Sequence, residues 1–161
     1  VEGLSGGAVL EIGQWKGCVM TRIERKAAAV VTDGGAREDY PHKELTENII
    51  GCAIRVHRAL GPGYLESIYE NALSHELSKA GLAFERQKVL KIYYDGVEVG
   101  EHRLDLLVEG KVMLELKSVD RLSDKHTAQV ISTLKAAGVK IALLMNFDEV
   151  RLAQGIKRVA L

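Results

Sequence analysis

An acid and a lysine stand two positions apart in Glu115-Leu116-Lys117, and a second acid, Asp105, lies in the segment just before them. Side chains of a strand alternate between faces, so Glu115 and Lys117 share one face and Leu116 takes the other. Burying a carboxylate and an ammonium beside apolar residues is costly unless they pair with each other or bind something. The pattern therefore indicates a polar site built into an apolar sheet.

The turn at Glu109-Gly110 decides whether Asp105 joins this site. A two-residue loop would pair Asp105 with Leu114 and direct Glu115 to the opposite face. A three-residue loop with Gly110 in a left-handed conformation would put Asp105 and Glu115 on one face of neighbouring strands. We predict the three-residue loop.

Two neighbouring carboxylates repel each other, and one of them takes up a proton unless a cation lies between them. Carboxylate oxygens suit hard cations such as Mg²⁺ or Mn²⁺. Such an ion can polarise a phosphate oxygen and acidify a water, and a nearby lysine can hold that water or neutralise charge. Asp105, Glu115 and Lys117 thus form a set capable of phosphodiester hydrolysis. The competing interpretation is a solvated sheet face, on which acids and lysines are common and short motifs mislead.

Two helices are expected before this region, followed by a sheet with one further helix. Apolar residues recur at helical spacing over residues 44–60, and Gly61-Pro62-Gly63 ends that pattern. A second helix is expected from Tyr64 to Ala80, with Gly81 as its cap. The remaining expected elements are strands at 89–94, 97–108 (with a bulge near Gly100), 112–118, 139–147 and 156–159, and a helix at 124–137 capped by Ser123.

Chain length and composition indicate a single folded domain. A chain of 161 residues with 47% hydrophobic content supports one domain, which we expect at residues 42–161. Residues 1–41 are rich in Gly and Ala without periodicity, and are predicted to be a flexible N-terminal extension. Two cysteines make no disulfide framework, and no apolar run is long enough to cross a membrane. A reducing cytoplasm is the expected location. The formal net charge of zero gives no global sign of nucleic-acid binding.

Several separated motifs within residues 43–161 resemble the GxxExxY family, a branch of the PD-(D/E)XK nuclease superfamily. The naming motif stands here as Gly63-Tyr64-Leu65-Glu66-Ser67-Ile68-Tyr69. Other similar segments are Ile50 to Arg58, Leu60 to Gly63, Arg103 to Val108, Glu115 to Lys117 and Gly155 to Arg158. Their agreement in order is more specific than any one of them.

The resemblance implies an α/β fold with a restriction-endonuclease-like αβββαβ core, a mixed sheet flanked by helices, and Mg²⁺-dependent cleavage of nucleic acid, DNA in the first instance. Asp105 and Glu115 would be metal ligands, and Lys117 would act on the water or the transition state. Glu66 resembles an additional helix-borne acid and metal ligand of related nucleases. Gln129 matches a helix-borne glutamine of many members. Thr133 departs from the aromatic residue that relatives often carry, which bears on substrate positioning.

Two alternatives to an active DNA nuclease remain open. The first is a catalytically silent nucleic-acid-binding or scaffold domain that retains the fold. The second is cleavage of RNA or of a small nucleotide, which would use the same phosphate chemistry. Tyr69 is expected to support packing or a hydrogen bond rather than chemistry.

Overall fold

The computed structural model describes residues 41–161, so the predicted N-terminal extension lies outside the described residues except for Pro41. Two helices come first, α2 at Lys43–Leu60 and α3 at Glu66–Lys79. The glycine pair around Pro62 separates them, with Gly61 and Gly63 both at positive φ. Helix α3 begins two residues later than predicted because Leu65 is still extended, with φ −66° and ψ 147°. Gly81, at φ 71°, follows the end of α3 as predicted.

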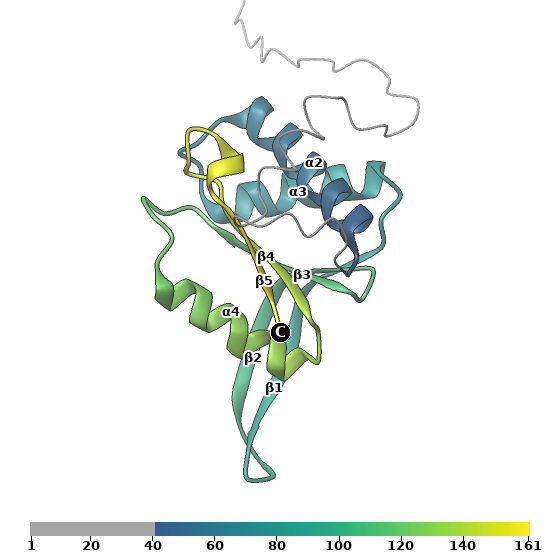
Figure 1. Ribbon diagram of the computed structural model, residues 1–161, viewed down its shortest axis with the longest axis vertical. Coiled ribbons are helices and arrows are strands. Elements are labelled where there is room, and N and C mark those ends of the chain that lie inside the picture. The colour runs from purple at the N-terminus through teal and green to yellow at the C-terminus, as the bar shows by residue number, and fades with distance from the viewer. Residues whose placement is uncertain (1–40) are drawn as a thin grey trace, which may run out of the picture.

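Five strands form one mixed sheet in the order β1-β2-β3-β4-β5 (Figure 1). The strands are β1 at Phe84–Tyr94, β2 at Val97–Val108, β3 at Val112–Lys117, β4 at Ile141–Asn146 and β5 at Ile156–Ala160. Neighbours are antiparallel except β3 and β4, which run parallel and are joined through helix α4 at Asp124–Ala137. A parallel pair needs such a crossover connection. A short 3-10 helix, η1 at Leu152–Gln154, precedes β5.

Most of the predicted elements are confirmed, including α4 with Ser123 as its cap and the predicted α/β core with a mixed sheet. Strand β1 was underestimated, since it begins at Phe84 rather than Val89. Its first half is an exposed, charged edge strand, which lacks the apolar alternation that predicts a strand. The predicted bulge near Gly100 is present, because Ile92 pairs with Gly100 and Tyr93 with Glu98, which leaves Val99 without an opposite residue.

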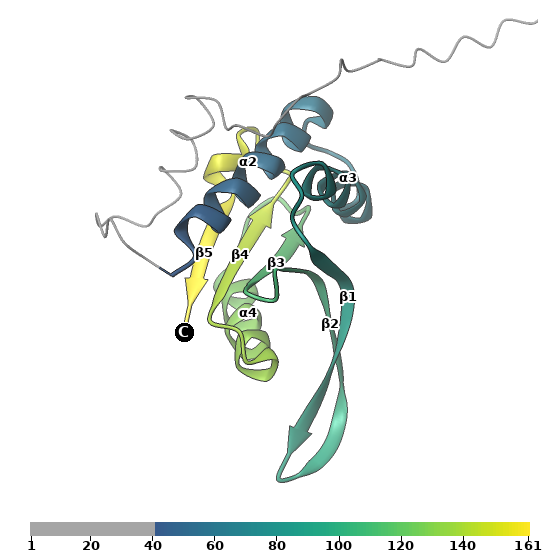
Figure 2. The same ribbon diagram turned by 90° about the vertical axis from the view of Figure 1, so that its right-hand side faces the viewer.

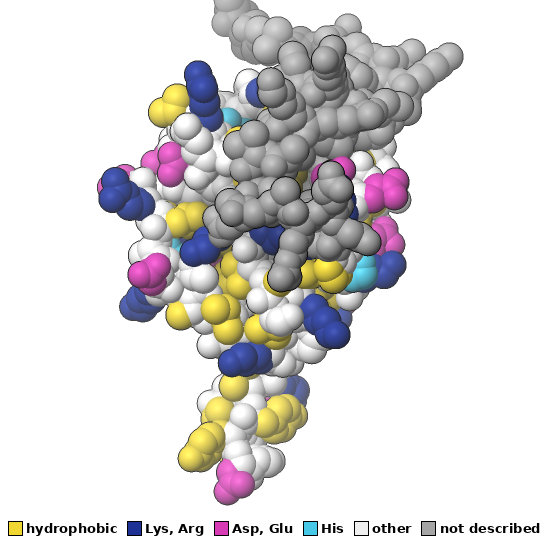
Figure 3. All heavy atoms as spheres, in the orientation of Figure 1, with side chains coloured by type: hydrophobic (Ala, Val, Ile, Leu, Met, Phe, Trp, Pro, Cys, Tyr) yellow, Lys and Arg dark blue, Asp and Glu magenta, His cyan; other side chains and the backbone are white. Residues whose placement is uncertain are grey.

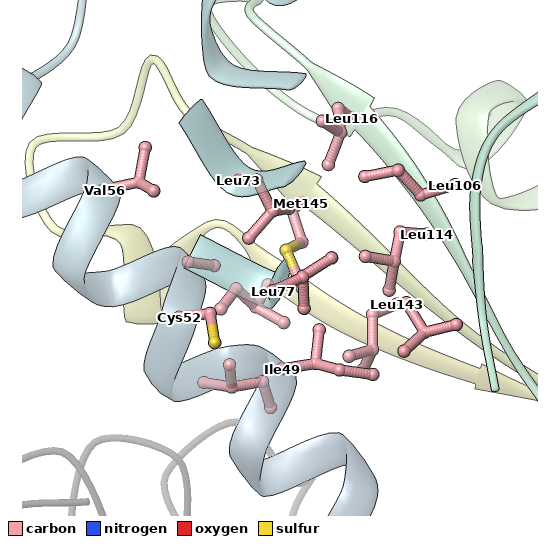
Figure 4. Packing of buried hydrophobic residues seen from close by; sticks show 14 of the residues in the cluster. Ile49, Cys52, Val56, Leu73, Leu77, Leu106, Leu114, Leu116, Leu143 and Met145 are labelled. Carbon is pink, nitrogen blue, oxygen red and sulfur yellow. The ribbon is translucent and has the colours of Figure 1, made fainter. Parts of the chain in front are cut away.

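Helices cover both faces of the sheet (Figure 2). The larger core lies between the sheet and helices α2 and α3, where Ile49, Cys52, Leu73 and Leu77 pack against strand residues (Figure 4). Cys52 is fully buried and serves as a small core side chain. The second core lies between the sheet and α4 and includes Val130 and Leu134. In the described part of the chain, no helix is long and apolar enough to cross a membrane.

The outer part of the β1–β2 hairpin, residues 91–101, extends beyond the rest of the sheet and is called the hairpin arm below (Figures 1 and 2). Strand β3 pairs only with the inner end of β2, at Leu106, Leu107 and Val108. Residues 93–101 are all exposed. Exposed large hydrophobic side chains gather on the arm (Figure 3), namely Tyr93, Tyr94, Val97 and Val99.

Candidate active site

The turn between β2 and β3 sets the register of the site. Val108 pairs with Val112, which leaves a loop of Glu109, Gly110 and Lys111, and the Lys111 amide donates to the Val108 carbonyl at 2.9 Å. The predicted three-residue turn is therefore confirmed. Both Glu109 and Gly110 adopt positive φ, at 53° and 63°, although only the glycine was expected to. Glu109 is held there because its carboxylate accepts from the Ala83 amide at 2.6 Å and its own amide donates to the Ala83 carbonyl.

This register brings the two predicted acids to one face. Leu106 stands opposite Leu114, so Asp105 and Glu115, each one residue further from the turn, project to the other side. Regular pairing of β2 with β3 ends at that leucine pair. Beyond it, the Asp105 carboxylate accepts from the Leu116 amide at 2.8 Å. Asp105 thus takes the place of a backbone acceptor at the point where the two strands separate.

Burial dominates the chemistry of Asp105. The pKa of the Asp105 carboxyl is raised to about 7, chiefly by removal from water and in smaller part by the neighbouring charges of Glu115 and Glu66. The hydrogen bond from the Leu116 amide and the charge of Lys117 act in the opposite direction. An acid with a pKa near neutrality, inside a group of acids, exchanges readily between a proton and a cation.

Glu115 and Lys117 form a buried ion pair on this face, with Lys117 Nζ 2.7 Å from Glu115 Oε1. Glu115 is 5% exposed, while Leu114 and Leu116 on the opposite face belong to the core under α2 and α3. Burial alone would lower the pKa of Lys117, but its hydrogen bond with Glu115 and the surrounding carboxylates outweigh burial and raise it. Lys117 therefore stays charged at neutral pH and compensates the charge of Glu115.

Glu66 joins the group from the first turn of α3. Burial raises the pKa of the Glu66 carboxyl, Lys117 lowers it, and Glu115 and Glu70 raise it further. These mutual effects place Glu66 in electrostatic range of the Glu115–Lys117 pair, although the helix and the sheet are far apart in the sequence. We refer to Asp105, Glu115, Lys117 and Glu66 as the acidic cluster.

Tyr69 fixes the loop that precedes Glu66 and leads into α3. Its hydroxyl donates to the Gly61 carbonyl at 2.6 Å and accepts from the Tyr64 amide at 3.1 Å. Its ring is fully buried and stacks on Phe147 at a centroid distance of 4.6 Å. The expectation that Tyr69 supports packing and a hydrogen bond is confirmed. The same loop is tied to the sheet, because the Ser118 hydroxyl donates to the Tyr64 carbonyl at 2.7 Å.

Asn146, which motif reasoning missed, shapes the chain just after Lys117. It pairs with Lys117 at the end of the parallel β3–β4 ladder and is fully buried. Its side chain accepts from the Val119 amide at 3.0 Å and donates to the Val119 carbonyl at 2.6 Å. The available signal was a lone amide that ends the apolar run Ile141–Met145, since buried amides need partners.

Helix α4 covers the face of the sheet to which Asp105 and Glu115 project, since Leu107 and Met113 of that face pack against it. Gln129 is exposed, and no hydrogen bond of its side chain reaches the acidic cluster within residues 41–161. Thr133 is buried and its hydroxyl donates to the Gln129 carbonyl at 2.9 Å, so it is a packing residue of the helix. His126 completes the cap of α4 with Ser123. Hydrogen bonds and charge effects thus connect four of the five predicted catalytic residues, Asp105, Glu115, Lys117 and Glu66, and within residues 41–161 none connects Gln129 to them.

The donor chemistry of the cluster fits a hard divalent cation, since carboxylates are the ligands that such ions prefer and the charge of Glu115 raises the pKa of both Asp105 and Glu66. The predicted ligands Asp105, Glu115 and Glu66 are not arranged as a finished cage: within the described residues, no three acid, histidine or cysteine side chains are grouped so as to hold a metal. One Glu115 oxygen is engaged by Lys117. Binding an ion there requires a side-chain rearrangement.

Comparison with known proteins identifies one family. The family model described as PD-(D/E)XK nuclease superfamily matches residues 43–159, which spans α2 to the end of the sheet. No curated protein and no solved structure matches the chain.

Proposed function

Because the chain belongs to the PD-(D/E)XK nuclease superfamily, we propose that it hydrolyses phosphodiester bonds of nucleic acid, DNA in the first instance, at the acidic cluster. The observation that carries the proposal is the placement of Asp105 and Glu115 on one face of diverging strands, where burial raises the pKa of Asp105 to about 7. A half-buried acid held at such a pKa is a frequent mark of a functional site. We take residues 42–161 as the nuclease domain.

In this proposal Asp105, Glu115 and Glu66 hold Mg²⁺ or Mn²⁺, which when bound supplies the charge that polarises a phosphate oxygen and acidifies a water. Lys117 lies within 2.7 Å of Glu115 and keeps its charge, so it orients the water or stabilises the anionic transition state. The Leu116 amide keeps the Asp105 carboxylate in place. Gln129 remains a candidate substrate contact from α4.

We also propose that the chain belongs to the GxxExxY branch. Each motif position has its own physical role: Gly63, at φ 99°, permits the turn into α3, Glu66 reaches the acidic cluster, and Tyr69 binds the loop between them. These three roles support the interpretation that the motif acts as a unit that positions the Glu66 carboxylate near the sheet.

The test is a cleavage assay with single- and double-stranded DNA, with and without Mg²⁺. Wild-type protein is expected to cleave only with Mg²⁺, and Asp105→Asn to lose activity. Glu101→Gln is the matched control, because Glu101 is an exposed acid on the same strand. Equal activity of wild type and Asp105→Asn would rule out catalysis at this cluster.

A silent binding or scaffold domain is the second candidate function. The Glu115–Lys117 pair supports it, because the two buried charges already compensate each other, and so does the net charge of zero. This alternative expects no cleavage and no stabilisation by Mn²⁺. RNA in the same substrate panel tests whether the preference for DNA holds.

A further inference from the structure

Large apolar side chains are exposed at the start of α3, on either side of Glu66. Tyr64 is 48% exposed, Leu65 73% and Ile68 39%. Isolated exposed apolar residues are ordinary, but three within five positions beside a buried acidic cluster form a local patch. We call Tyr64, Leu65 and Ile68 the apolar ledge.

Tyr64 is held in place rather than free to turn away. Its amide donates to the Tyr69 hydroxyl at 3.1 Å, and its carbonyl accepts from the Ser118 hydroxyl at 2.7 Å. Its ring meets the Tyr69 ring edge-on at a centroid distance of 6.2 Å. An aromatic ring fixed in this way can accept a flat partner with little loss of conformational entropy.

Tyr64 and its hydrogen-bond partner Ser118 are both close in the sequence to residues of the acidic cluster. Ser118 directly follows Lys117, and Glu66 is the second residue after Tyr64. A nucleotide whose phosphate lies at the cluster would therefore carry its base toward the ledge. With a net charge of zero, the chain has little general attraction for a polyanion, so local contacts must supply more of the affinity.

We propose that the ledge, with Tyr64 at its centre, stacks an unpaired nucleobase beside the scissile phosphate, so that single strands or frayed ends are preferred over intact duplex. The inference rests on the proposed function. Bases inside a duplex are stacked on one another and present no free face, whereas an unpaired base stacks on an aromatic side chain whatever its identity.

The experiment measures binding and cleavage separately. A single-stranded oligonucleotide carrying one 2-aminopurine, and the same strand in a duplex, are titrated with full-length protein in EDTA, where no cleavage occurs. Single-strand binding with quenched 2-aminopurine fluorescence is expected for wild type. Tyr64→Leu, which stays apolar but loses the ring, and Tyr64→Ala should bind the single strand roughly tenfold more weakly. Tyr64→Phe should bind as wild type does. Tyr94→Ala, an exposed tyrosine of the hairpin arm, is the control.

Cleavage in Mg²⁺ should show the same order of variants in KM, with a smaller change in kcat. Wild-type binding to duplex as tight as to single strand, or Tyr64→Leu binding as tightly as Tyr64→Phe, would overturn the ledge while leaving cleavage intact. Circular dichroism checks that each variant is folded. If wild type neither cleaves DNA nor binds either strand form, the proposed function and the role of the ledge are refuted together. If the ledge binds a protein partner and no nucleic acid, the proposal for the ledge is overturned.

Discussion

The Leu116 amide donates to Asp105 Oδ2 at 2.8 Å, so an acid side chain links strand β3 to β2 at the point where their regular backbone pairing ends. The acid is therefore both a tie within the fold and a candidate ligand. Its ionisation should be visible in stability, which leads to the first prediction.

Replacing Asp105 with Asn should change how stability depends on pH. The ordinary pKa of this carboxyl is 3.8 and the folded value is about 7. Between these values the unfolded chain has lost a proton that the folded chain keeps, so the free energy of unfolding falls as pH rises. The fall amounts to about 1.4 kcal/mol for each pH unit that separates the two values. Urea unfolding in EDTA should show wild type losing stability from pH 4 to 7, and the slope should be shallower in Asp105→Asn, in which Glu66 is the acid of the cluster that still has a raised pKa. Parallel curves would contradict a raised Asp105 pKa.

A divalent ion should stabilise the folded protein through the cluster. At a concentration 100 times its dissociation constant, Mn²⁺ would add about 2.7 kcal/mol. Thermal unfolding at pH 8 should therefore show a rise in Tm for wild type that disappears in Glu115→Gln. Glu101→Gln should keep the rise. An unchanged Tm in wild type would favour the silent-domain alternative.

Replacing Lys117 with Met should destabilise the protein in EDTA, because Glu115, 5% exposed, would lose its compensating charge. Breaking a buried pair on one side costs on the order of 3 to 5 kcal/mol, and less here because Lys117 keeps some contact with water. Mn²⁺ should raise the Tm of this variant more than that of wild type, since the ion supplies the missing positive charge. Cleavage should be lost even when Mn²⁺ is bound. A Tm gain no larger than that of wild type would argue against a shared site.

Removing the hydroxyl of Tyr69 should loosen the loop that precedes Glu66. Tyr69→Phe keeps the stack on Phe147 but loses the bonds to Gly61 and Tyr64. Urea unfolding should show a loss of about 1 to 3 kcal/mol. Cleavage should fall as well, and Mn²⁺ should bind more weakly in the same thermal assay. Tyr94→Phe changes an exposed hydroxyl and should alter neither quantity.

Adding a methyl group at Gly155 should disturb the junction behind the cluster. A Cβ there would lie 2.6 Å from the Asn146 carbonyl oxygen and 2.6 Å from the Glu149 Cγ. Gly155→Ala should cost about 1 to 3 kcal/mol, as overpacking does. Gly100→Ala is the matched control, because nothing lies within 4 Å of its added Cβ. Equal stability of the two variants would show that the backbone around Asn146 adapts freely.

The sheet half of the site was predictable because it depends on local rules. Strand alternation places Glu115 with Lys117, and the length of one turn places Asp105 with them. The helix half was only suggested by resemblance, since the approach of Glu66 depends on how α3 packs on the sheet. Asn146 and Ser118 act through tertiary hydrogen bonds that no periodicity encodes. Gln129 marks another limit, because the helix that carries it was correctly predicted, whereas its role at the site depends on tertiary placement that helical periodicity does not encode.

The hairpin arm has a practical consequence. Its tip, Asp95-Gly96, turns back at positive φ of 50° and 77° within a fully exposed run, and the tip lies at the opposite end of the molecule from α3 (Figure 2). A circular permutation that opens the chain between these two residues, or a reporter peptide inserted there, would be connected to the rest of the protein through the two strands of the hairpin arm. The arm therefore offers an attachment point through which the protein can be tethered or labelled at a distance from the proposed active site.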